Sequence, residues 1–150
     1  MRVFLDANIL FSAAKSDGAI RQLFHEICAL GHECAVDEYV VAEARRNLEL
    51  KFKTSLHDFE RILGEVTRLP TPPADIASSL APILPEKDRP VLASAVRHGC
   101  HALLTGDKAH FGHLFGKTIA GVSIQSPQGL AEFLAAGAPR LNPRARGRRR

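Results

Sequence analysis

Hydrophobic residues in this chain form two kinds of pattern, short continuous runs and stripes with helical spacing. Short apolar runs at residues 2–5, 33–36 and 102–104 predict buried strands, and the segment 121–124 predicts another. Apolar positions that recur every three or four residues predict amphipathic helices, and they occur at residues 18–30, 37–48, 55–66, 76–84, 86–98 and 126–134. Strands that alternate with helices favour a parallel sheet covered on both faces. The predicted fold class is therefore α/β with a central parallel sheet.

Several helix boundaries carry their own local signals. Asp37 and Ser126 stand at predicted N-cap positions, and Ser126 is followed by a proline at the first helical position. Ser55 and Asp58 have the spacing of a capping box. Pro90 is compatible with its predicted helix only in the first turn.

The size and composition of the chain fit one soluble domain. It has 150 residues, of which 45% are hydrophobic, enough for a sizeable core. The proline-rich stretch 70–73 predicts a loop rather than a domain linker. No apolar run approaches the roughly 20 residues that cross a bilayer, and the first residues lack the pattern of a signal peptide. Three cysteines without CxxC spacing indicate buried thiols in a reducing compartment. We therefore expect a cytoplasmic protein without a membrane segment.

The net charge of +4 hides an uneven distribution. Six of the 20 lysines and arginines lie in residues 139–150, which contain no acid, and this leaves 14 basic residues against 16 acidic ones elsewhere. The composition predicts a disordered, arginine-rich tail over 137–150. The tail either contacts nucleic acid through its charges or is an extension without a specific role.

Acidic residues stand at several predicted element boundaries. Asp6 follows the first strand, where a helix begins, and Asp107 follows the strand at 102–104. The carboxyl ends of strands in open α/β sheets form the edge at which ligands bind. Asp88 lies near a helix start, and Glu43 borders the apolar stripe of its helix. Clustered carboxylates repel one another unless a cation compensates. A hard cation such as Mg²⁺ or Mn²⁺ takes such oxygen ligands, and the arrangement suits phosphodiester hydrolysis.

Each acid also has a purely structural explanation. Asp6 and Asp88 fit caps of the helices that follow them. Asp107 fits a turn with the preceding glycine, and Glu43 fits an exposed helix face. For each residue taken alone, both interpretations stay open.

Four motifs occur along the chain in a fixed order: residues 5–10 (LDANIL), a helical Glu43, residues 87–95 (KDRPVLASA) and residues 104–107 (LTGD). Together they resemble the PIN domain family, a nuclease family that includes VapC-type toxins, over about residues 1–136. The resemblance implies a three-layer α/β/α sandwich and a metal-dependent ribonuclease, the toxin of a toxin–antitoxin pair. It implies Mg²⁺ or Mn²⁺ as cofactor, RNA as substrate, a protein antitoxin as partner, and homodimers. The implied catalytic and metal-binding residues are Asp6, Glu43, Asp88 and Asp107.

Three polar residues beside these acids are expected to act on the substrate side of the site: Asn8, Thr105 and Lys108. The resemblance implies that Asn8 orients Asp6 and that Thr105 orders a metal-bound water. A turn-stabilising role suits both residues equally well. Lys108 is a candidate for contact with the RNA backbone.

The chain departs from many PIN proteins at one place. Where they carry a further acid shortly after the equivalent of Asp107, this chain has Lys108, Ala109 and His110. The substitution puts a complete second metal site in doubt. His110 is expected either to contact phosphate or to pack beside Phe111.

Two other functions compete with a ribonuclease. The first is a PIN fold that binds RNA or protein without cutting, although retention of all four acids speaks against it. The second is a haloacid-dehalogenase-like phosphatase, which also begins with a strand-end aspartate. That chemistry needs another acid at position 8, where Asn8 stands.

Overall fold

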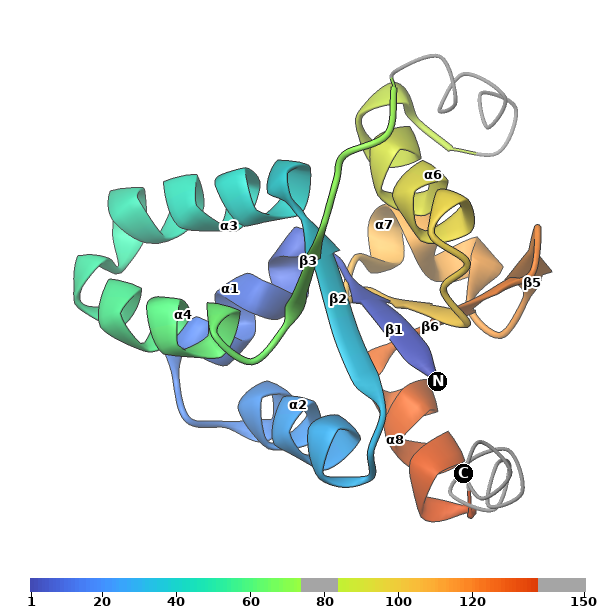
Figure 1. Cartoon of the computed structure of the whole chain (residues 1–150), viewed down its shortest axis with the longest axis horizontal. Coiled ribbons are helices and arrows are strands. Elements are labelled where there is room, and N and C mark those ends of the chain that lie inside the picture. The colour runs from blue at the N-terminus through green and yellow to red at the C-terminus, as the bar shows by residue number, and fades with distance from the viewer. Residues whose placement is uncertain (74–83, 138–150) are drawn as a thin grey trace.

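A six-stranded sheet runs through the middle of the computed structural model, which describes residues 1–73 and 84–137 (Figure 1). The strand order is β3-β2-β1-β4-β6-β5, and neighbouring strands are parallel except for β5 with β6. The strands are β1 Arg2–Leu5, β2 Glu33–Asp37, β3 Thr67–Leu69, β4 Ala102–Leu104, β5 Thr118–Ile119 and β6 Val122–Gln125. Strand β1 is central, and its apolar side chains are buried, as expected for a parallel strand covered on both faces.

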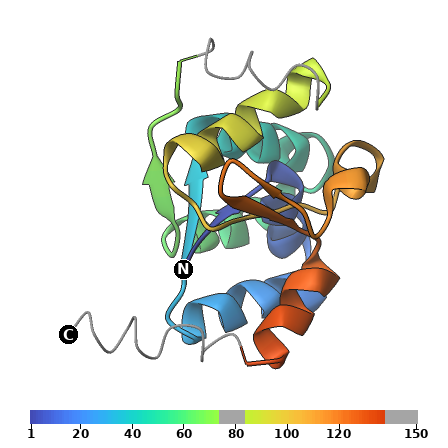
Figure 2. The same cartoon turned by 90° about the vertical axis from the view of Figure 1, so that its right-hand side faces the viewer.

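Helices cover both faces of this sheet. The α-helices are α1 Ala7–Lys15, α2 Ala19–Ala29, α3 Glu38–Lys51, α4 Leu56–Leu63, α6 Arg89–Arg97, α7 Lys108–Phe111 and α8 Pro127–Ala135. Short 3₁₀ helices lie at η1 Lys53–Ser55, η2 Glu86–Asp88 and η3 Gly112–Leu114. Helix α1 packs against α2, α3 and α4, and α2 packs against α8. Helix α6 lies across the sheet from α2 and α8 (Figure 2). The predicted three-layer α/β/α sandwich is confirmed.

Most local signals in the sequence produce the predicted elements. The strands predicted at 2–5 and 102–104 match β1 and β4. The Asp37 side chain accepts a hydrogen bond from the Val40 N–H at 3.1 Å, and so caps α3. Ser126 caps α8 in the same way, through the N–H of Gly129 at 3.0 Å. These caps work because each residue lies in extended backbone just before a helix.

The capping box predicted for Ser55 and Asp58 is wrong. Ser55 already lies in helical backbone, because η1 leads directly into α4, and its side chain makes no capping hydrogen bond. Its hydroxyl instead donates to the Lys15 carbonyl at 3.3 Å. Asp58 pairs with Arg21, with 3.1 Å between Oδ2 and the guanidinium nitrogen. An N-cap needs non-helical backbone, and the preceding 3₁₀ turn removes it.

Two predictions fall on residues outside the described ranges. The helix predicted at 76–84 lies there except for its last residue, and so does the predicted tail from 138 onward. Over the residues that are described, no helix combines the length and the apolar character that a bilayer span requires.

Candidate active site

Two adjacent strands bring distant parts of the chain to one edge of the sheet. Strands β1 and β4 are parallel neighbours, with Leu5 opposite Leu104. The residues that follow each strand therefore meet at the carboxyl edge. Just beyond the last residues of these strands, the Asp6 N–H donates to the Leu104 carbonyl at 3.0 Å. Asp6, Thr105 and Asp107 consequently belong to one rim.

Asp6 is held by three hydrogen bonds from the protein. Its Oδ1 accepts the Ala7 N–H at 2.7 Å. Its Oδ2 accepts the Thr105 hydroxyl at 2.8 Å and the Asn8 side-chain amide at 3.1 Å. Only 7% of Asp6 is exposed. Asp6 is both the N-cap of α1 and a carboxylate fixed at the rim, so the structural and functional interpretations of this residue are compatible.

Thr105 and Asn8 join the two loops that follow β1 and β4. The Thr105 Oγ1 donates to Asp6 and accepts the Asp107 N–H at 3.1 Å. The Asn8 Oδ1 accepts the Gly106 N–H at 2.8 Å, while its amide nitrogen reaches Asp6 and Thr105. Asn8 therefore has the contact with Asp6 that the sequence led us to expect.

The expected contact of Thr105 with substrate or a metal-bound water is not supported by its position. Thr105 is 0% exposed, and its one hydroxyl hydrogen is donated to Asp6. Its neighbours in sequence did not reveal this burial. Thr105 positions Asp6 rather than touching what enters the site.

Asp88 is as buried as Asp6 but is held differently. It is 8% exposed and occupies the N-cap position of α6, yet its side chain makes no capping hydrogen bond. Because η2 precedes α6, the backbone of Asp88 is already helical there, and the capping interpretation is wrong. Among the described residues, its buried Oδ2 has no hydrogen-bond partner. The Asp88 carboxylate is thus free to serve another purpose.

Asp107 and His110 complete this side of the site. The Asp107 Oδ1 accepts the His110 N–H at 3.1 Å and caps the short helix α7. The ring Nδ1 of His110 lies 3.0 Å from Asp107 Oδ2 and 2.9 Å from Asp88 Oδ2. One donor atom from each of the three residues lies within 4.8 Å of the others. His110 therefore stands between two of the predicted acids.

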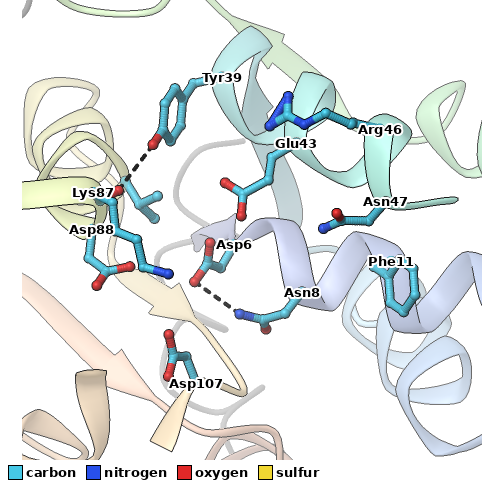
Figure 3. A pocket seen from close by; sticks show the side chains of 11 residues that line it. Asp6, Asn8, Phe11, Tyr39, Glu43, Arg46, Asn47, Lys87, Asp88 and Asp107 are labelled. Carbon is cyan, nitrogen blue, oxygen red and sulfur yellow. Dashed lines mark hydrogen bonds between the residues drawn. The ribbon is translucent and has the colours of Figure 1, made fainter. Parts of the chain in front are cut away.

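All four predicted acids line one cleft of about 340 Å³ (Figure 3). Glu43 reaches it from α3, and its carboxylate points toward that of Asp6 in the close view. A second hollow of about 380 Å³ shares Asn8, Glu43 and Asp107 with the first. Asp6 and Glu43 face the cleft but lie outside the tight group formed by Asp88, Asp107 and His110, a statement limited to the described residues. Glu43 and Asp107 therefore lie where the two hollows meet.

Burial and nearby negative charges raise the pKa of two of the acids, Asp6 and Asp88. Burial raises the pKa of Asp6 to about 6; the hydrogen bonds from Thr105 and Ala7 oppose this rise, and the charges of Glu43 and Asp88 add to it. Burial also raises the pKa of Asp88, and the charge of Asp107 adds to that effect, whereas His110 and Lys87 oppose it. A cleft with crowded carboxylates and one unpartnered oxygen fits a hard divalent cation.

Other residues of the cleft were not singled out from the sequence. Figure 3 shows Lys87 extending beside Asp88, and Arg46 and Asn47 on α3 next to Glu43. Tyr39 closes one wall, where its hydroxyl donates to the Lys87 carbonyl at 3.0 Å. Arg46 and Asn47 lie three and four positions after Glu43, so helical spacing was a usable signal for them. Lys108 is exposed on α7 and is not among the residues lining this cleft.

No family model and no curated protein matches the sequence. Solved structures do match the fold. VapBC2 from Rickettsia felis, bound to a DNA fragment from its promoter, has a TM-score of 0.64 at 14% identity, over 84% of this chain and 98% of that chain. PAE2754 from Pyrobaculum aerophilum has a TM-score of 0.63 at 20% identity, over 91% and 90%. FitAcB from Neisseria gonorrhoeae has a TM-score of 0.57 at 18% identity, over 84% and 98%. The PIN fold expected from the sequence motifs is confirmed.

Proposed function

We propose that this chain is a metal-dependent endoribonuclease of the PIN type and the toxin of a toxin–antitoxin pair. One observation carries the proposal: acids from four separate segments line a single cleft at the carboxyl edge of a PIN-fold sheet. They are the four that the motif order implied, Asp6, Glu43, Asp88 and Asp107.

The four acids would hold one or two Mg²⁺ or Mn²⁺ ions. When bound, such an ion lowers the pKa of a water molecule and neutralises charge that builds on the phosphate. The protein contributes the placement of the ligands. Asp6 is fixed by Thr105, Asn8 and the start of α1. Asp107 is fixed by capping α7. Rigid ligands of this kind reduce the reorganisation that catalysis requires.

Exposed basic side chains around the cleft are suited to contact with an RNA backbone. Arg46 and Lys87 line it and are exposed, so each is available to a phosphate. Lys108 lies on the neighbouring helix α7 and remains a candidate for the same role. The second hollow shares Asp107 with the cleft, so a bound RNA strand would have room to extend from one into the other. We expect single-stranded RNA to follow these two hollows.

The proposal includes a protein partner. Two of the structures that share the fold are VapBC2 and FitAcB, and this likeness supports an antitoxin for the present chain. A homodimer and a cytoplasmic location are further parts of the same proposal.

The test is cleavage of labelled single-stranded RNA by the purified full chain with Mn²⁺. We expect cleavage that chelation abolishes and that Asp6→Asn reduces to background. Asp17→Asn is the matched control, because Asp17 is exposed and does not line the cleft. Cleavage by Asp6→Asn at the wild-type rate would remove Asp6 from the active site. Tight RNA binding without cleavage by the wild type would favour the alternative of a non-catalytic PIN module.

A further inference from the structure

His110 places one nitrogen against two carboxylates. Its Nδ1 lies 2.9 Å from Asp88 Oδ2 and 3.0 Å from Asp107 Oδ2. A ring nitrogen carries at most one hydrogen, and here it is shared with Asp107. The Asp88 oxygen therefore remains buried without a hydrogen-bond partner within the described residues. A proton on His110 cannot satisfy both acids.

A cation satisfies all three groups at once. Burying an unpaired carboxylate oxygen is costly, so this arrangement calls for a ligand. In an octahedral shell with bonds of about 2.1 Å, adjacent ligand atoms lie about 3.0 Å apart. The two observed distances from Nδ1 match this spacing. The three donor atoms also lie close enough together to face one ion.

The direction of the His110 ring is set by its helix. The His110 N–H is bound by Asp107 Oδ1, and the next residue, Phe111, is fully buried. These contacts anchor α7 at His110 and at the residue after it. About a third of the His110 side chain, 31%, remains exposed, and Asp88 and Asp107 line the cleft, so ions can reach the three donor atoms.

We propose that His110 is a metal ligand, and that its Nδ1 joins Asp88 and Asp107 in a mixed nitrogen and oxygen set that prefers Mn²⁺ to Mg²⁺. Imidazole nitrogen is a better ligand for first-row transition metals than for Mg²⁺, which prefers oxygen. To bind, the ring must be neutral with its hydrogen on Nε2. The proposal builds on the ribonuclease function by naming its preferred cation, but metal binding is measured without RNA.

The experiment measures Mn²⁺ and Mg²⁺ binding to the metal-free full chain by calorimetry. Pulsed electron paramagnetic resonance of the Mn²⁺ complex, with histidine selectively labelled with ¹⁵N, detects a bound imidazole directly. We expect a histidine coupling in the wild type. His110→Asn should lose it and weaken Mn²⁺ binding at least about 10-fold, since even outer partners of metal ligands contribute that much. His110→Asp supplies oxygen only and should narrow the preference for Mn²⁺.

His113→Asn is the matched control, because His113 is exposed in the same segment and should leave the coupling and affinity unchanged. Mn²⁺ bound to the wild type without a histidine coupling overturns the proposal, and this readout needs no variant to fold. Absence of Mn²⁺ binding overturns it as well. A histidine coupling without RNA cleavage would support His110 as a metal ligand and contradict the ribonuclease function. RNA cleavage without a histidine coupling would support the ribonuclease and contradict His110 as a ligand.

Discussion

Asp6 and Asp88 are two similarly buried carboxylates in one cleft, and they differ in the hydrogen bonds that they accept. Asp6 receives hydrogen bonds from Ala7, Asn8 and Thr105. The Asp88 Oδ2 receives none from the described residues. Burial raises the pKa of both. Burial therefore raises the free-energy cost of charging both carboxylates. The hydrogen bonds determine which carboxylate is held in a fixed position before a ligand binds.

The Asp6 carboxylate is therefore held in position by the protein, whereas Asp88 Oδ2 has no such hydrogen bond from the described residues. A buried acceptor that loses its partners costs about 1–3 kcal/mol. Asp6 avoids much of that cost through its neighbours, whereas Asp88 would avoid it by binding the proposed cation. Four experiments test this contrast.

The largest effect is on cleavage. Asp88→Asn and Asp6→Asn should each lower kcat/KM at least about 100-fold, because each removes a contact worth several kcal/mol in the transition state. Their stabilities should differ. Asp88→Asn removes a buried charge whose Oδ2 accepts no hydrogen bond from the described residues, and should leave the metal-free fold as stable as the wild type or more so. RNA cleavage assays and urea unfolding measure the two effects. Wild-type cleavage rates in both variants would contradict a catalytic site that contains Asp6 and Asp88.

The second effect concerns pH. The folded-state pKa of Asp6 is about 6, above its unfolded value, so the folded protein holds this proton more tightly. The resulting stabilisation is complete below about pH 4 and is lost as the pH rises through 6. The Asp6→Asn variant has no carboxyl group at this position, so its stability does not fall in this pH range for that reason. From pH 4 to 7 its free energy of unfolding should therefore gain up to about 3 kcal/mol relative to the wild type.

Urea unfolding of both metal-free proteins across that pH range provides the measurement. A constant difference between them would mean that burial does not raise the pKa of Asp6.

The third experiment weakens the fixed side. Thr105→Val keeps the shape of the side chain but leaves Asp6 Oδ2 and the Asp107 N–H each without one partner. We expect a loss of about 1–3 kcal/mol in the free energy of unfolding, together with reduced cleavage. Thr118→Val is the control, because Thr118 is exposed on β5. If the two variants are equally stable, the hydroxyl of Thr105 does not hold Asp6.

The smallest effect is stabilisation by metal. Mn²⁺ at ten times its Kd should raise the free energy of unfolding of the wild type by about 1.4 kcal/mol. Asp88→Asn should show less of this increase at the same concentration, because the binding site has lost a ligand. Thermal melts with and without Mn²⁺ provide the readout. An identical shift in both proteins would place the ion away from Asp88.

The sequence predicted the parts of this fold that depend on local pattern. The rim position of Asp6 follows from an apolar strand and an immediate helix, and the caps at Asp37 and Ser126 follow from neighbouring residues. Strand β3 could not be found in this way, because two of its three residues are polar and its strand character comes from pairing with β2.

The sequence predicted four acids that line one cleft, but not their partners there. Asp88 has the right residue type for a helix cap, and only the preceding 3₁₀ turn prevents it from capping. Thr105 stands beside the acids in sequence, but the fold buries it completely. The contact of His110 with Asp88 joins residues on η2 and α7. Such contacts arise from packing between distant segments, which residue spacing does not encode.

The central place of β1 has a consequence for synthesis of the protein. Thr105 reaches Asp6 across 99 residues of sequence, and β1 pairs with β4 as well as with β2. A growing chain that has left the ribosome only as far as β3 lacks Thr105, Asp107 and one neighbour of β1. Contacts this distant in sequence form late. A fragment released early in translation therefore carries only half of the cleft, and the four acids come together only after Asp107 has been made.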